Sequence, residues 1–108
     1  MAIKYNAHSI LELFNSEPIV IDSEAEIYKY QINDKAGFEL ILYFSVYDQN
    51  VTVRLEHKGL ENPIFDVEIK NVKEIKADRE KLVFFKQEKY EPAIQVIISP
   101  SFMLDFSF

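Results

Sequence analysis

The sequence predicts a mainly β fold of the α+β class, in which a short N-terminal helix packs on a twisted antiparallel meander of six to eight strands. Three observations support this prediction. Apolar and polar residues alternate along most of the chain, helical spacing is confined to one segment near the N-terminus, and short polar turns separate the candidate strands. Without a second helix to carry crossover connections, successive strands are expected to pair antiparallel. Both a half-barrel and a sandwich are compatible with this pattern.

The helix signal lies directly after the first six residues. Four apolar residues have the i, i+3, i+4, i+7 spacing of one helical face: Ala7, Ile10, Leu11 and Phe14. Two N-caps are open, because Ser9-Ile10-Leu11-Glu12 matches a capping box and Asn6 is an alternative; Pro18 ends the segment. A helix of two to three turns is not stable alone in water, so its apolar face is expected to lie on the sheet.

Eight segments have the character of β-strands. Residues 38–46 are apolar on both faces, which predicts a central strand covered on both sides. Residues 51–55 and 65–69 alternate cleanly, which predicts one buried and one solvated face. The other candidates are residues 27–32, 72–76, 82–86, 93–98 and 102–108.

The C-terminal candidate strand carries four large apolar side chains on one face: Phe102, Leu104, Phe106 and Phe108. Chain ends fray unless they are tied into a sheet, so we expect this strand to dock in the chain's own core, with a homodimer interface as the alternative. The chain has 108 residues, 48% of them hydrophobic, with no linker and no internal repeat. One domain spanning residues 1–108 is therefore expected.

Composition excludes several classes of function. The chain has no Cys, which removes disulfides, thiolate zinc sites and cysteine nucleophiles. Gly37 and Gly59 are its only glycines, so no glycine-rich phosphate loop can be built and no cofactor is expected. No signal segment and no membrane-length apolar run is present, which predicts a cytoplasmic protein without a membrane association.

The net charge of −6 is distributed unevenly. Residues 1–69 hold 12 acidic and 5 basic residues, whereas residues 70–108 hold 6 acidic and 7 basic ones. Nucleic-acid binding is disfavoured by this balance. The most acidic stretch contains no Lys or Arg and consists of Glu12, Glu17, Asp22, Glu24 and Glu26. It is interpreted either as a solvated surface or as a patch that steers a basic partner into contact.

Within that stretch, Asp22, Glu24 and Glu26 recur at every second residue, which predicts one face of a strand. A calcium loop would need a glycine at its sharp turn, and none is present here. Farther along the chain, Arg54 is expected to pair with Asp66 or Glu68 across a hairpin, in a charge ladder rather than a cation site.

Few residues are suited to catalysis. His8 adjoins the helix start and is expected at the surface, whereas His57 ends a strand beside Glu56 and is a candidate for a loop-edge site. A pocket between the helix and the concave face of the sheet would have Glu56 and His57 at its mouth, together with Tyr43 or Tyr47. Tyr28 and Tyr30 share a strand face and are interpreted as residues that cover the core.

The favoured hypothesis is a small non-catalytic binding domain that captures a basic protein partner through the acidic stretch. In size, acidity and lack of Cys, the chain is similar to many immunity proteins that block bacterial toxins, although no motif carries this analogy. The alternative is a small-ligand-binding protein or an enzyme that uses the pocket just described. A homodimer formed by edge strands is the third possibility.

Overall fold

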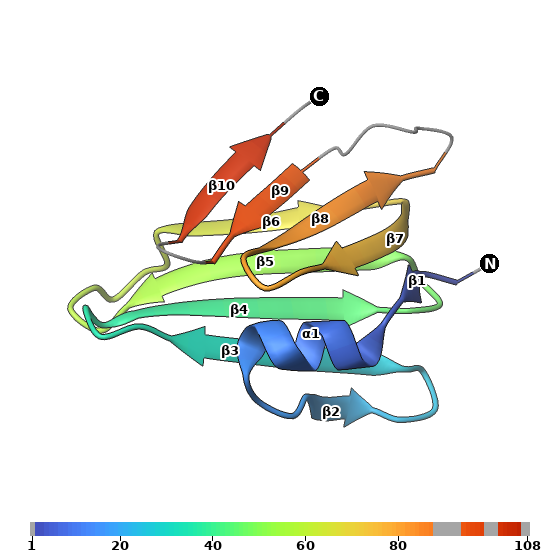
Figure 1. Cartoon of the computed structure of the whole chain (residues 1–108), viewed down its shortest axis with the longest axis horizontal. Coiled ribbons are helices and arrows are strands. Elements are labelled where there is room, and N and C mark those ends of the chain that lie inside the picture. The colour runs from blue at the N-terminus through green and yellow to red at the C-terminus, as the bar shows by residue number, and fades with distance from the viewer. Residues whose placement is uncertain (1, 88–93, 99–101, 107–108) are drawn as a thin grey trace.

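The computed structural model describes residues 2–87, 94–98 and 102, together with the backbone of residues 103–106. This part of the chain forms one helix and ten strands (Figure 1). In chain order they are β1 (Lys4–Tyr5), α1 (Ala7–Phe14), β2 (Ile19–Asp22), β3 (Ile27–Asn33), β4 (Phe38–Ser45), β5 (Asn50–His57), β6 (Phe65–Ile69), β7 (Val72–Ala77), β8 (Lys81–Lys86), β9 (Ile94–Ile97) and β10 (Met103–Phe106).

The strands form two five-stranded sheets. One has the order β2-β3-β4-β5-β6 and is antiparallel throughout, and the other has the order β1-β7-β8-β9-β10. In the second sheet only β1 runs parallel to its neighbour, β7. The predicted fold class, mainly β with one short N-terminal helix and largely antiparallel strands, is confirmed. The structure adds β1 and β2 to the eight expected strands.

A hydrophobic core fills the space between the two sheets, so of the two expected shapes the sandwich is the observed one. From the first sheet, Leu40, Leu42, Phe44 and Val53 contribute side chains that are at most 2% exposed. The second sheet contributes Val72, Ile75, Leu82, Phe84 and Val96, which are equally buried. The expectation that β4 is covered on both sides is wrong: Leu40, Leu42 and Phe44 face the core, whereas on the opposite face Ile41 is buried but Tyr43 is only half-buried and no second layer of the described residues covers it.

Helix α1 lies against β3 of one sheet and β7 of the other, so it covers the core where the sheets diverge. Asn6 is its N-cap and accepts a hydrogen bond from the Ser9 N–H (3.1 Å), which selects one of the two expected caps. The buried face consists of Ile10, Leu13 and Phe14, whereas Ala7 of the expected face is exposed. The expected face and the observed face both have helical spacing. The contact of α1 with β3 and β7 determines which of the two is buried.

The C-terminal strand is tied into the second sheet. β10 pairs antiparallel with β9, with Phe106 opposite Ile94, and the side chain of Phe102 packs against the core. Docking in the chain's own sheet is therefore observed for the backbone. The predicted apolar face of Leu104, Phe106 and Phe108 lies outside the described side chains.

Candidate functional site

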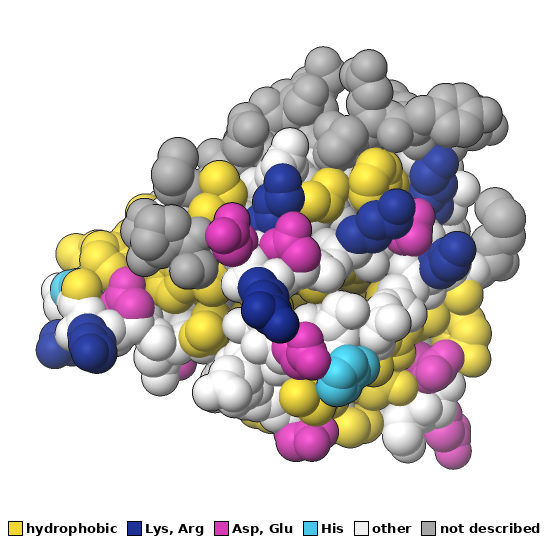
Figure 2. All heavy atoms as spheres, in the orientation of Figure 1, with side chains coloured by type: hydrophobic (Ala, Val, Ile, Leu, Met, Phe, Trp, Pro, Cys, Tyr) yellow, Lys and Arg dark blue, Asp and Glu magenta, His cyan; other side chains and the backbone are white. Residues whose placement is uncertain are grey.

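The carboxylates of the acidic stretch follow the border of the molecule formed by α1, β2 and the β2–β3 turn. We call this surface the acidic margin and define it by Glu12, Glu17, Asp22, Glu24 and Glu26. All of these residues are exposed except Glu26, which is half-buried. In Figure 2 several acidic side chains lie along the lower border of the molecule, and others lie higher, among most of the Lys and Arg on this face.

The local backbone places acids at both ends of β2. Asn15 adopts a left-handed conformation (φ 53°) that ends α1, and Glu17 and Pro18 then lead into the strand. At the other end, the Oδ1 atom of Asp22 accepts hydrogen bonds from the backbone N–H groups of Glu24 (3.0 Å) and Ala25 (2.9 Å). This side-chain-capped turn reverses the chain into β3.

The expectation that Asp22, Glu24 and Glu26 share one strand face is therefore wrong. β2 ends at Asp22, and the following residues form a turn instead of continuing the strand. The physical reason is the Asp22 side chain, which offers the backbone hydrogen bonds that compete with strand pairing. Glu26 then takes a left-handed conformation (φ 50°) where the chain enters β3.

Glu26 belongs to a cluster of tyrosines that the sequence did not reveal. The Tyr28 hydroxyl donates to Glu26 Oε1 (3.4 Å), and a hydrogen bond from Tyr47 to Glu26 raises the pKa of the Tyr47 phenol. Tyr5 packs against Tyr28 (ring centroids 6.4 Å apart) and Phe44 (5.1 Å). Burial, followed by the charges of Tyr28 and Glu26, raises the pKa of Tyr5 to about 12.

The cluster brings together residues from β1, β3 and the turns at the ends of β2 and β4. No spacing in the sequence relates these positions, because β1 belongs to the second sheet whereas β3 and β4 belong to the first. Of the candidate tyrosines, Tyr28 and Tyr30 do share the core-facing side of β3: both contact Phe44, with ring centroids 5.8 Å and 6.1 Å away.

Between its acidic ends, β2 presents three consecutive apolar residues to solvent. The exposed fractions are 46% for Ile19, 53% for Val20 and 47% for Ile21. β2 is the terminal strand of its sheet and pairs only with β3, with a bulge between Val20 and Asp22. An exposed apolar patch framed by polar groups is typical of an interaction surface.

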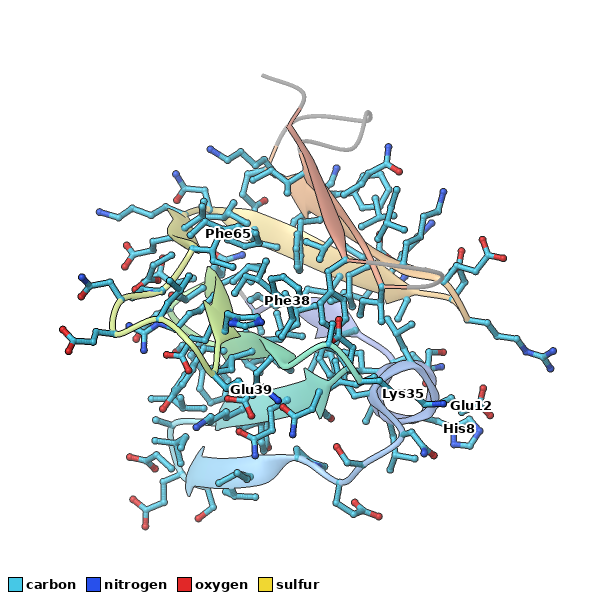
Figure 3. All side chains as sticks on the ribbon, turned by 90° about the vertical axis from the view of Figure 1, so that its left-hand side faces the viewer. His8, Glu12, Lys35, Phe38, Glu39 and Phe65 are labelled. Atoms are coloured by element: carbon cyan, nitrogen blue, oxygen red, sulfur yellow. The ribbon has the colours of Figure 1, made fainter. Side chains whose placement is uncertain are left out.

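Glu12 lies beside a histidine of its own helix. His8 Nε2 lies 2.8 Å from Glu12 Oε1, one helical turn away, and both side chains are more than half exposed. Figure 3 shows the two residues side by side on the outer surface of α1. His8 is therefore at the surface, as expected, and a protonated His8 would partly offset the charge of Glu12.

The structure does not bring the four expected pocket-mouth residues together. Glu56 and His57 line a shallow depression of about 580 Å³ at one end of the first sheet. Tyr43 lines a different depression, on the outer face of that sheet, and Tyr47 lies in the turn after β4, at the opposite end from His57. Tyr43 is separated from the others because its side chain faces the outer side of the sheet, and Tyr47 is separated from His57 by the length of β4. The space between α1 and the sheet is filled by core side chains, among them Phe14 and Tyr30.

His57 joins two loops through both of its ring nitrogens. The Gly59 N–H donates to Nδ1 (3.0 Å), so Nε2 carries the proton and donates to the Ala36 carbonyl (3.0 Å). The ring also packs edge-on against Phe38, with centroids 4.5 Å apart. These contacts hold the β3–β4 turn against the chain that follows β5.

The charge ladder on the outer face of the first sheet is confirmed. Arg54 lies directly opposite Asp66 in the β5–β6 register, and their side chains are 2.8 Å apart; Glu56 is 3.5 Å from the same guanidinium. The hydrogen bond to Asp66 raises the pKa of Arg54. Each exposed pair of this kind contributes on the order of 0.2–1 kcal/mol.

Within residues 2–87, 94–98 and 102, no three His, Asp or Glu side chains are grouped so that they could hold a metal ion. In the same part of the chain, no helix has the length and apolar character needed to cross a membrane.

Comparisons with known proteins give one structural likeness. No family model matches the chain, and no curated protein matches it significantly. Among solved structures, one chain of a contact-dependent growth inhibition toxin–immunity protein complex from Klebsiella pneumoniae 342 has a similar fold, with a TM-score of 0.82. The match covers 99% of this chain and 98% of that chain at 21% sequence identity. The two chains therefore share a fold over their full lengths.

Proposed function

We propose that this chain is a non-catalytic binding domain that captures and neutralises a basic protein partner, as an immunity protein does, through the acidic margin. The observation that carries the proposal is the placement of exposed acids at both ends of an exposed apolar strand. Glu17 precedes β2 and Glu24 follows it, both exposed, with Ile19, Val20 and Ile21 between them.

The charge arrangement suits capture of a cationic surface. Carboxylates at two ends of one strand attract a basic partner from a distance and orient it before contact, and the apolar residues between them supply the short-range binding energy. A depletion of charge at the centre and a polar rim is the usual composition of a protein interface. The likeness to a chain of a toxin–immunity complex supports the class of partner.

The test uses the product of the gene that neighbours this one. Expression of that product alone is expected to arrest growth, and co-expression of this chain is expected to restore it. The double variant Glu17→Lys and Glu24→Lys should lose this protection and weaken binding in calorimetry by at least tenfold. Asp22 is left intact, because its side chain caps the β2–β3 turn.

The matched control is Glu61→Lys with Glu68→Lys, which changes the net charge equally but lies on and beside β6, the opposite edge of the same sheet. The control should protect as the unmodified chain does. Equal loss in both variants would mean that overall charge, not the acidic margin, drives binding. Growth arrest by this chain alone, or full protection by the Glu17/Glu24 variant, would contradict the proposal.

A further inference from the structure

The outer edge of β2 differs from the other sheet edges whose side chains are described. β1, an edge of the second sheet, has only two residues. β6, the other edge of the first sheet, carries exposed charges at Asp66 and Glu68. Short length and outward charges are devices that keep an edge from pairing with another chain. β2 has neither along Ile19–Val20–Ile21.

The side chains of β2 continue the apolar interior of the protein outward. Val20 lies opposite Tyr28 in the register, so both face the core side of the sheet, and Tyr28 contacts Phe44. Ile19 lies opposite Lys29 on the outer face. The Lys29 ammonium is 5.9 Å from the centroid of the Tyr43 ring, which belongs to β4 on the side of β3 away from β2.

We propose that β2 binds the partner by strand addition: an extended segment in which Lys or Arg alternates with β-branched apolar residues pairs along its outer edge. This inference rests on the proposed function and names the element that holds the partner. Backbone N–H and C=O groups that point away from β3 would receive the segment, and its apolar side chains would cover Val20 on the core side. Its basic side chains would reach Glu17 at one end and Asp22 and Glu24 at the other.

Charge decides between this occupant and a second copy of the chain. Antiparallel pairing of β2 with β2 of another copy would bring the Glu17 end of each strand to the Asp22 and Glu24 end of the other. Like charges placed opposite one another across strands are destabilising. A basic segment turns the same contacts into attraction, so the acidic margin selects against self-pairing and for a basic partner.

The bulge between Val20 and Asp22 limits how far such pairing can extend. A bulge disrupts the hydrogen-bond ladder locally and twists the strand. The ladder is therefore short, and both the apolar contacts and the terminal charges must contribute to affinity. Removing either one should weaken binding.

The first experiment measures hydrogen exchange of the full chain with a synthetic peptide of alternating Lys and Val, capped at both ends. We expect slower exchange at the amides of residues 19–22 in the presence of this peptide. A peptide of alternating Glu and Val should leave the exchange rates of these amides unchanged. Absence of protection in β2 at millimolar peptide, or protection at β6 instead, would overturn the inference.

The second experiment compares Val20→Lys with Leu60→Lys. Leu60 is the matched control, because it is 58% exposed against 53% for Val20 and lies in the loop between β5 and β6. Val20→Lys should weaken peptide binding and partner capture at least tenfold, and Leu60→Lys should change neither. Circular dichroism and the unfolding midpoint of each variant establish that it is folded.

The outcomes separate the two proposals. If Glu17→Lys with Glu24→Lys abolishes partner capture and Val20→Lys does not, the acidic margin binds the partner without strand addition, and this inference fails alone. If the peptide protects β2 while the neighbouring gene product does not bind, the proposed function fails and the edge remains a binding site. A concentration-dependent dimer in sedimentation that is lost in Val20→Lys would assign the edge to a second copy and overturn this inference.

Discussion

β4 and β2 belong to the same sheet and are both rich in apolar residues, yet their surroundings are opposite. β4 lies between β3 and β5, and Leu40, Leu42 and Phe44 are at most 2% exposed. β2 lies at the edge, and each of its three apolar residues is about half exposed. The difference shows that composition gives a strand its pairing ability, whereas its place in the sheet decides whether that ability serves folding or remains for a partner.

The comparison makes the centre of the sheet the site of greatest sensitivity. Leu42→Ala removes most of a fully buried side chain from the core between the sheets, and the expected loss is about 2–5 kcal/mol in the free energy of unfolding. Urea unfolding followed by circular dichroism measures it. A loss below about 1 kcal/mol would show that the core collapses around the cavity and that the two strands differ less than their burial indicates.

The cap of α1 should have an intermediate effect. Asn6→Ala removes the acceptor of the Ser9 N–H and should lower the unfolding free energy by about 1 kcal/mol. The same denaturation measurement applies. Because the capping box was the alternative, Ser9→Ala is the matched variant and should cost less than Asn6→Ala; the reverse order would assign the cap to Ser9.

Tyr5 tests the boundary between the centre and the edge, since it contacts both Phe44 and Tyr28. Its pKa is raised to about 12 from an ordinary value of 10.0, so the folded state holds the phenol proton more tightly than the unfolded state. This stabilisation is complete below pH 10 and is lost as the pH rises toward about 12. Tyr5→Phe should reduce the slope of stability against pH in this window, as measured by unfolding at successive pH values.

A residual slope is expected in that variant, because burial also raises the pKa of Tyr30. Ultraviolet titration of tyrosinate absorbance provides an independent measurement, in which Tyr5→Phe should remove a phenol that titrates near pH 12. An unchanged high-pH limb would mean that Tyr5 is solvated in the folded protein.

The smallest effect is expected at the edge. Val20→Thr keeps the shape of the side chain and adds a hydroxyl that water can solvate, so the unfolding free energy should change by less than about 0.5 kcal/mol. Val53→Thr is the matched variant at a position that is 1% exposed, where the buried hydroxyl should cost about 1–3 kcal/mol. Equal costs at the two positions would show that β2 is packed against other parts of the protein in solution.

Several features followed from local pattern. The alternation in β5 and β6 placed Val51, Val53 and Ile69 inward, and the Arg54–Asp66 pair followed from the hairpin between these strands. Other features did not follow. The helical spacing of apolar residues in α1 fits two faces, and β1 is too short to have a pattern. Both therefore depend on contacts with β7, which lies more than fifty residues away in the chain.

The candidate site divides along the same line. Its charge could be predicted, because the absence of Lys and Arg between Glu12 and Glu26 is a property of the sequence. Its shape was not, because Asp22 uses its side chain to close a turn and Glu26 meets Tyr28 and Tyr47. Competition between side-chain and strand hydrogen bonds is settled only when the neighbouring strand is in place.

The sequence by itself determined a β-rich chain with one short helix, a two-sided apolar strand at its centre and an acidic N-terminal stretch. The tertiary structure alone decided that the sheet divides into two, that β2 stands at an edge and that the acids frame it. The reason is physical: periodicity and charge are encoded locally, whereas edge position and burial depend on which distant strands come together.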